Sequence, residues 1–284
     1  MKELKVTKIQ NQILLYLGQF KYLTLSQLLK LGSGTTQYKY LWKQASAMVK
    51  RSRPLIDAVR FNTIDRIGRV EDIYYLTKYG AKVLADTSPN SPALLPKGRV
   101  VSAKDYTHKI RTLDFQIDTY LYCKDSGLEL VKFLRYFDKT GNNRVDKNLS
   151  SLTKVKFKDG KSLIPDGLFI IDVDDFERLL LFELHLGKDS KRIFNQLTAH
   201  IDAMLSLKLH NAISYPVNRA YYVLVLFESS AVLESMIKRF KLTGELYSKI
   251  HQYVLCKTFD QFDKENYTDN WKTILGESKN LSVR

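Results

Sequence analysis

The sequence has 284 residues, which exceeds most single domains, and 44% of them are hydrophobic, enough for two domains with a core each. Its 45 Lys and Arg against 30 Asp and Glu give a formal net charge of +15. Such a charge favours nucleic acid as a partner over an anionic membrane surface. No apolar run reaches the roughly 18 residues of a spanning helix, and the first residues lack a secretory pattern. We therefore expect a cytoplasmic protein without membrane insertion.

The two cysteines, Cys123 and Cys256, lie far apart in the sequence. They are too few for a disulfide framework or a zinc module, so both are expected to be buried thiols. The composition changes between residues 86 and 104, where residues such as Pro89 and Pro92 interrupt the periodic apolar pattern. The predicted domains are residues 1–86 and 105–284, joined by a linker over 87–104.

The first domain is predicted to begin with three helices. Apolar residues at helical spacing predict the first over 5–17. Thr24 and Gln27 fit a capping box, which starts a second helix that stops at Gly32. A short turn then leads into a third helix over 36–50. The inward side chains expected on this third helix are Leu41, Trp42, Ala45, Met48 and Val49.

The opposite face of the third helix is polar and basic, and it suits a major groove because cationic side chains reach phosphates there. Two runs of strand character, 55–61 and 70–76, flank a basic turn and predict a hairpin, and Thr77 caps a closing helix. Helices in this order followed by a hairpin are typical of a winged helix-turn-helix. The candidate DNA-binding residues are Thr36, Lys39, Tyr40, Lys43, Lys50, Arg66 and Arg69.

Two alternatives stay open for the first domain. A basic helix face is often simply solvated, and helix-turn-helix units also dock other proteins. Tyr40 fits either a base-contacting residue or a core residue turned partly outward. The hairpin and the global charge favour DNA contact.

The second domain alternates helix and strand. Its helices are predicted over 106–123, 190–207 and 230–240, and its strands over 128–137, 164–173, 179–186, 220–227 and 253–255. The order α-β-β-β-α-β-α-β predicts a mixed sheet with helices on its faces. The fold class is therefore mixed α+β or α/β. A basic, polar stretch at 138–162 is predicted to be a long mobile loop.

Two carboxylates fall on adjacent predicted strands. Asp166 follows Pro165 at the start of one apolar strand, and Glu183 lies in the middle of the next. An ionised carboxylate is costly to bury among apolar residues unless a cation pairs with it, so the two could bind Mg²⁺ or Mn²⁺. Strand side chains alternate, so His185 shares a side with Glu183 and could be a ligand or a base that activates water.

Basic residues follow at once. Lys188, Lys191 and Arg192 are placed to hold or polarise a phosphate, and Gln196 and His200 lie further along the next helix. The candidate metal ligands are Asp166, Glu183 and His185, and the candidate catalytic residues add Lys188 and Lys191.

Each candidate also has an ordinary structural explanation. Asp166 could be a turn residue after Pro165, and His185 could simply be hydrogen-bonded in place. His108 and Asp114 lie six residues apart on one helix, so a shared ligand role is not expected, although Asp114 could serve as an additional helical acid.

At Pro165-Asp166 and Glu183-Leu184-His185 the sequence resembles the PD-(D/E)XK nuclease superfamily, whose core has the same αβββαβ order. The resemblance implies metal carboxylates at Asp166 and Glu183 and a restriction-endonuclease-like domain over 105–284. His185 occupies the usual place of the lysine, so Lys188 or Lys191 would have to substitute.

The whole chain is also similar to the replication-relaxation family and to MobC-type relaxases of mobilisable plasmids, which join a winged helix to such a domain. The segments that carry this likeness are 74–80, 108–114, 165–167 and 183–187. It implies a metal-dependent DNA-nicking relaxase acting at a plasmid or mobile-element origin in conjugation or replication. Other mobilisation or replication proteins would then be its partners.

Two other classes of function remain. A non-catalytic origin-binding accessory factor with a decayed nuclease site is favoured by the absent lysine. A transcriptional regulator would use the second domain to sense a ligand or to form a homodimer. Asp166 and Glu183, in the expected order on strands, favour the enzyme.

Overall fold

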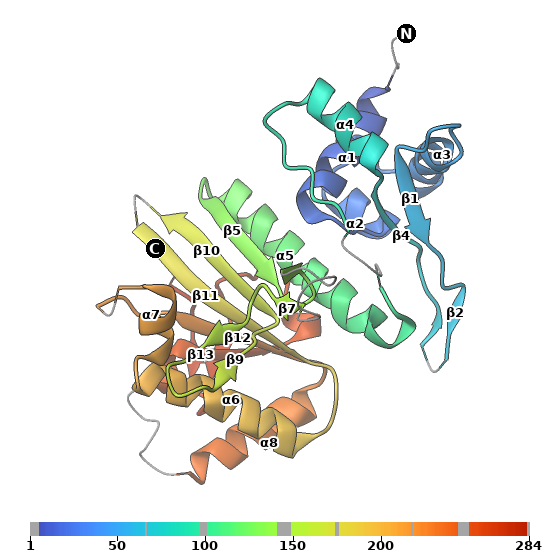
Figure 1. Ribbon diagram of the computed structural model, residues 1–284. Coiled ribbons are helices and arrows are strands. Elements are labelled where there is room, and N and C mark those ends of the chain that lie inside the picture. The colour runs from blue at the N-terminus through green and yellow to red at the C-terminus, as the bar shows by residue number, and fades with distance from the viewer. Residues whose placement is uncertain are drawn as a thin grey trace. The chain divides into compact units, whose positions relative to one another are not determined.

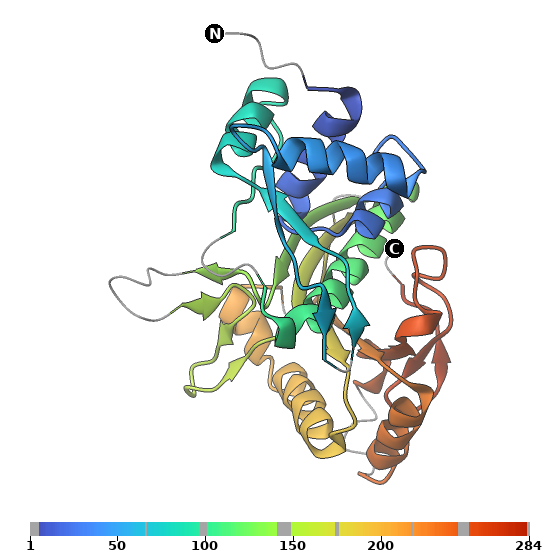
Figure 2. The same cartoon turned by 90° about the vertical axis from the view of Figure 1, so that its right-hand side faces the viewer.

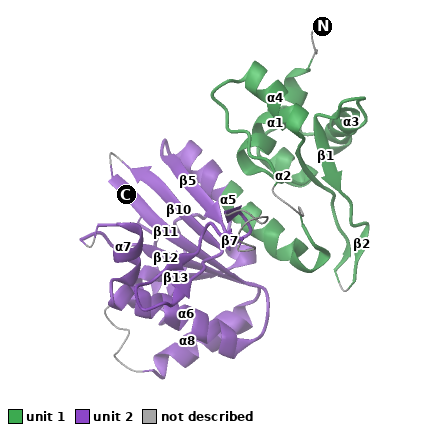
Figure 3. Cartoon of the chain, viewed as in Figure 1, with its two compact units in different colours: residues 1–117 green, residues 118–284 purple. Residues whose placement is uncertain are grey.

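The computed structural model describes residues 6–65, 67–96, 101–140, 149–173, 176–216, 218–243 and 250–282. Over these ranges the protein is mixed α+β, as predicted. The chain divides into two compact units, Met1–Ile117 and Asp118–Arg284 (Figure 3). The division falls inside helix α5 (Tyr106–Asp125), so the first unit continues beyond the linker that the sequence predicts.

Unit 1 begins with α1 (Lys8–Phe20), α2 (Leu25–Lys30) and α3 (Tyr38–Val49). The capping box predicted at the start of α2 is confirmed: Thr24 Oγ1 accepts from Gln27 N at 3.2 Å, and Gln27 Oε1 accepts from Thr24 N at 3.0 Å. A second capping box, at the start of α1, sets that helix three residues later than the apolar spacing predicted. In both places side chains replace the backbone partners that a helix start lacks.

A two-stranded arm follows the helices (Figure 1). Strand β1 (Ile56–Val59) pairs antiparallel with β4 (Ile73–Leu76), and the chain between them pairs again as β2 (Thr63–Ile64) with β3 (Gly68–Arg69). The predicted hairpin is therefore present. Its candidate Arg66 lies outside the described residues.

Helix α4 (Lys78–Thr87) closes the unit, and the prediction that Thr77 caps it is confirmed by Gly80 N donating to Thr77 Oγ1 at 2.9 Å. Gly80 lies against the start of β1: a Cβ atom there would stand 1.8 Å from the carbonyl oxygen of Leu55. Only glycine permits this close approach of helix and strand.

One prediction for α3 is wrong. Leu41, Ala45 and Met48 are fully buried as expected, but the side chain of Trp42 is 48% exposed. The three buried residues follow one another at intervals of four and three, so they mark the centre of the inward stripe. Trp42 is a further 100° around the helix and shares its face with Tyr38, one turn earlier.

Unit 2 is built on a seven-stranded mixed sheet of order β15-β14-β13-β12-β11-β10-β5 (Figure 1). Its strands are β5 (Glu129–Arg135), β10 (Gly167–Val173), β11 (Phe176–His185), β12 (Tyr222–Phe227), β13 (Val254–Thr258), β14 (Trp271–Thr273) and β15 (Ser278–Lys279). Strands β11, β12 and β13 run parallel, and the remaining neighbours pair antiparallel. The predicted helices and strands of this part of the chain occur in the predicted order, but the structure adds short strands between β5 and β10, a second helix between β11 and β12, and the strands β14 and β15 after the predicted last strand.

Helices α6 (Ser190–Leu205), α7 (Lys208–Ile213) and α8 (Ser230–Lys241) complete unit 2 (Figure 2). Ile193 and Leu197 of α6 and Met236 of α8 join one buried cluster with Leu181 and Val225 of the sheet. This helix-covered face of the sheet forms the main core of unit 2. Among the described helices, none combines the length and apolar character needed to cross a bilayer.

The stretch over 138–162, predicted as one long loop, is structured in its described part. Strand β6 (Lys139–Thr140) pairs with β7 (Ser150–Ser151), and β8 (Val155–Lys156) pairs with β9 (Ser162–Leu163). Val155 and Leu163 are buried, and Gly160, at a φ of 82°, supplies the turn between their strands. Val155 and Leu163 are only two apolar residues in a polar stretch, so the sequence shows no periodicity from which these strands could be predicted. Residues 141–148 lie outside the described part.

Candidate functional site

Asp166 and Glu183 lie on one face of the sheet in unit 2. Gly167 of β10 pairs with Phe182 of β11, so the next step along the antiparallel pair brings Asp166 opposite Glu183. Opposite residues in an antiparallel pair project to the same side. Glu183 is fully buried and Asp166 is 9% exposed. The two carboxylates share the face that α6 and α8 cover, on interior strands of the sheet.

Two side chains of α6 bind the Glu183 carboxyl group. Gln196 Nε2 donates to Glu183 Oε2 at 2.5 Å, and His200 Nε2 lies 2.5 Å from Glu183 Oε1. Gln196 and His200 are four residues apart, so they are neighbours on the same face of the helix. The sequence placed both residues on this helix but gave neither a role, because nothing in the sequence shows which side chains a buried Glu faces.

Burial dominates the electrostatics of this pair. It raises the pKa of Glu183 well above its usual 4.5; the nearby Asp166 raises it further, and the hydrogen bond from Gln196 opposes both. Burial and the neighbouring His185 lower the pKa of His200 to about 3. Burial thus disfavours the charged form of both groups, and a protonated Glu183 carboxyl group would be placed to donate to His200 Nε2.

The remaining candidate residues of unit 2 are close to Glu183 in the sequence, but some are buried and others are exposed to solvent. His185 is buried at the end of β11, two residues after Glu183 and with its ring 5.4 Å from that of Phe227. Asp166 Oδ2 accepts from Leu184 N at 2.8 Å, which fixes its carboxylate beside β11. Lys188 is exposed just before α6, and Lys191 and Arg192 are exposed in its first turn.

The oxygen donors of Asp166 and Glu183 fit a hard divalent cation. Mg²⁺ and Mn²⁺ prefer carboxylate oxygens, and a cation would relieve the repulsion that raises the Glu183 pKa. Within the described ranges, no group of three or more His, Cys, Asp and Glu side chains has a metal-binding arrangement. Among the described residues, the carboxylate pair of Asp166 and Glu183 is the part of the predicted ligand set that lies at paired positions on one sheet face.

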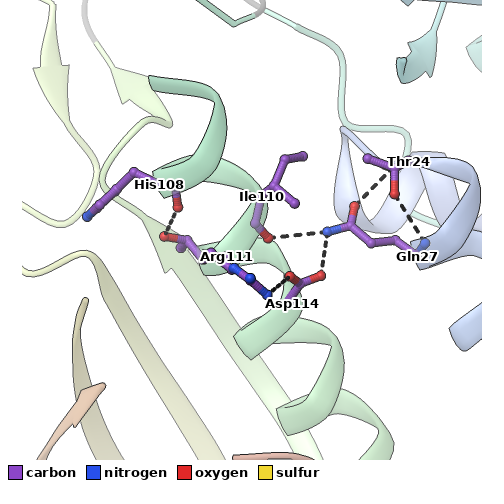
Figure 4. Close-up of polar contacts among 7 residues, drawn as sticks. Thr24, Gln27, His108, Ile110, Arg111 and Asp114 are labelled. Carbon is purple, nitrogen blue, oxygen red and sulfur yellow. Dashed lines mark hydrogen bonds and ion pairs between the residues drawn. The ribbon is translucent and has the colours of Figure 1, made fainter. Parts of the chain in front are cut away.

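Asp114, considered as an additional acid, is engaged within unit 1 (Figure 4). Gln27 Nε2 donates to Asp114 Oδ1 at 2.8 Å and to the Ile110 carbonyl at 3.2 Å, and Arg111 Nη1 lies 3.8 Å from Asp114 Oδ2. Burial raises the pKa of Asp114, while Gln27 and the nearby cations lower it. Gln27 of the α2 capping box thus also holds α5 in place, and its bond to Asp114 gives Asp114 a structural role.

An open groove of about 880 Å³ runs between α3 and the two-stranded arm of unit 1. Its lining combines cationic, aromatic and acidic side chains. Of the candidate DNA-binding residues, Lys39, Lys50 and Arg69 line it. Thr36, Tyr40 and Lys43 are exposed elsewhere on unit 1. Tyr40 is 43% exposed, so its core alternative is wrong.

Six aromatic or charged residues that line this groove were not among the predicted DNA-binding residues: Tyr38, Trp42, Arg60, Glu71, Asp72 and Tyr74. The spacing of Tyr38 and Trp42 shows that they share a helix face, since they are four residues apart, but it does not show that this face is open. The residues of the arm were not recognisable, because their position depends on the twist of the hairpin. Tyr38 Oη donates to Glu71 Oε1 at 3.0 Å, and Arg60 Nε lies 3.7 Å from Asp72 Oδ2.

Comparisons with protein-family models, with curated proteins and with solved structures found no significant match to this chain. Any function assigned to this protein therefore rests on the residues of the two sites themselves.

The raised pKa of Glu183 gives a pH-dependent prediction for the metal-free protein. An acid whose folded pKa exceeds its unfolded value stabilises the fold below the unfolded pKa and loses this contribution as the pH rises. Glu183→Gln keeps an acceptor for Gln196 and a donor for His200, but it cannot ionise. Its melting temperature should match that of the wild type below about pH 4.5 and increasingly exceed it above that value, measured by thermal denaturation in EDTA. A difference that stays constant with pH would contradict this.

Proposed function

We propose that the protein binds DNA through unit 1, with α3 as the recognition helix and the β2–β3 end of the arm as the wing of a winged helix-turn-helix. The observation that supports this most is the groove between α3 and the arm, whose cationic residues are Lys39, Lys50, Arg60 and Arg69. Cations gathered along one groove bind phosphates and release their counterions, which is the main source of affinity for DNA. The net charge of the whole chain, +15, likewise favours a polyanionic partner.

Exchanging Lys39 and Lys50 together for Ala should weaken binding to a mixed-sequence duplex. The slope of log Kobs against log salt should fall by about 0.9 for each phosphate that is no longer neutralised, because fewer counterions are released. Fluorescence anisotropy with a labelled duplex at several salt concentrations measures both effects.

Lys43→Ala is the matched control, since Lys43 is exposed on the same helix and does not line the groove. It should change the affinity and the slope much less than the groove variants do. If Lys43→Ala has the larger effect, DNA contacts the outer face of α3 that the sequence predicts, and the groove assignment is wrong.

A second candidate function is metal-dependent DNA nicking by unit 2. Asp166 and Glu183, at paired positions on one sheet face, favour it. They would hold Mg²⁺ or Mn²⁺, with His185 as a further ligand or a base, while Lys188 and Lys191 would contact phosphate. The bound cation would supply an activated water and charge neutralisation. By the resemblance, the protein would be a relaxase of the replication-relaxation or MobC type with a PD-(D/E)XK domain, acting in the cytoplasm at a plasmid origin.

The non-catalytic alternative has its own support in the structure. Both oxygens of the Glu183 carboxyl group are hydrogen-bonded to α6, and His185 stands where the resemblance requires a lysine. An origin-binding accessory factor could keep this arrangement as a structural element. Cleavage of supercoiled origin plasmid with and without Mg²⁺ or Mn²⁺ distinguishes the two: conversion to open circles supports the enzyme, and unchanged plasmid under every metal supports the accessory factor.

A further inference from the structure

Exposed aromatic residues are concentrated on α3. Tyr38, Tyr40 and Trp42 are 45%, 43% and 48% exposed. Tyr38 and Trp42 line the groove, whereas Tyr40 does not. An exposed indole loses the free energy that burial would provide, so a large ring kept in a groove indicates a partner that covers it.

The other lining residues limit what that partner can be. Four cationic side chains and the acidic Glu71 and Asp72 share the groove with Tyr38, Trp42 and Tyr74. Cations beside aromatic rings match a phosphate backbone that carries flat bases. The volume of about 880 Å³ is within the range of about 300–1,000 Å³ found for ligand clefts, which suits nucleotide-sized groups.

We propose that this groove holds single-stranded DNA, with an unpaired base stacked on the indole of Trp42. This deepens the proposed DNA-binding function and rests on it. In a duplex each base is already stacked on its neighbours and offers only its edges in the grooves, so an indole has no base face to cover. An unpaired strand exposes those faces, and stacking on aromatic side chains is how proteins bind it.

The acidic residues of the groove fit the same occupant. The Glu71 carboxylate accepts from Tyr38 Oη at 3.0 Å and from Ser26 N at 3.2 Å, so its position is fixed. A fixed carboxylate in a basic groove repels phosphate, but it accepts hydrogen bonds from the amino groups of bases. The groove therefore offers cations to the backbone of the strand and a ring and a carboxylate to its bases.

The two tryptophans allow a direct test with the full chain. Trp271 is fully buried in unit 2, with its Nε1 donating to the Tyr267 carbonyl, so its emission is a constant background. Binding of a single-stranded oligothymidylate should quench the emission of Trp42, and Trp42→Phe should abolish the quench. Trp42→Ala should weaken binding of this oligonucleotide by about tenfold or more, the effect of losing one stacked base.

Tyr40→Ala removes a similarly exposed ring from the same helix, outside the groove, and should weaken single-strand binding less than Trp42→Ala does. An equal or larger loss would place the bases on the outer face of α3 and overturn the inference. The affinity for a duplex of mixed sequence should fall by less than about twofold in Trp42→Ala. Unchanged single-strand affinity in Trp42→Ala, or equal losses for both DNA forms, overturns the inference. If duplex still binds while single strands do not, only this inference fails; if neither binds, the proposed function fails with it.

Discussion

Asp166→Asn and Glu183→Gln are each expected to abolish metal-dependent nicking of a supercoiled origin plasmid while DNA binding by unit 1 stays nearly intact. Losing one ligand of a catalytic cation costs orders of magnitude, because the cation both lowers the pKa of the attacking water and neutralises charge that develops on the phosphate. The proposed binding site is the groove of unit 1, whose lining includes neither substituted residue. Gel analysis of plasmid forms and duplex anisotropy measure the two functions separately.

The isosteric amides make this test specific for charge. Asn and Gln keep the volume and most hydrogen bonds of the acids, so loss of folding would not explain a loss of activity. Full nicking activity in both variants would rule out the metal site at this pair. Partial activity in one variant would make that residue a spectator beside the site.

The second large effect concerns stability. Glu183→Leu should lower the free energy of unfolding by about 1–3 kcal/mol, because the fully buried His200 loses its Nε2 partner. Glu183→Gln should not, since its amide can still bond to both Gln196 and His200. Urea denaturation of the three proteins in EDTA, at a single pH near neutrality, measures the difference.

The double variant Glu183→Leu, His200→Leu checks the cause. Replacing both partners of a buried polar pair with apolar side chains removes the unsatisfied group, so part of the lost stability should return. If the double variant is less stable by the sum of the two single effects, the hydrogen bond between Glu183 and His200 does not account for the result.

Local signals explain most of what the sequence predicted correctly. Thr24 with Gln27, and Thr77 before α4, were recognisable because a capping residue acts over three positions. The interior strands β10, β11 and β12 were recognisable from dense apolar runs, and the side shared by Glu183 and His185 followed from strand alternation. Each of these inferences needs only a few consecutive residues.

Long-range packing accounts for what was missed. Trp42 has the hydrophobicity of a core residue. Which face of α3 is buried depends on the position of the other elements of unit 1, and that face carries Leu41, Ala45 and Met48. The partners of Glu183 come from the next helix along the chain, at a register that sequence spacing does not fix. A carboxylate in an apolar run indicates that a partner must exist without saying which residue provides it.

Helix α5 has a consequence for how the protein unfolds. The two compact units meet within this helix, between Ile117 and Asp118, and not in a loop. Helices shorter than about 12–15 residues are marginal in isolation, so dividing α5 would leave two pieces that hold their helical form poorly. Melting either half removes backbone hydrogen bonds from the other. The units are therefore expected to lose structure cooperatively, and a protease would find its first cuts outside residues 106–125.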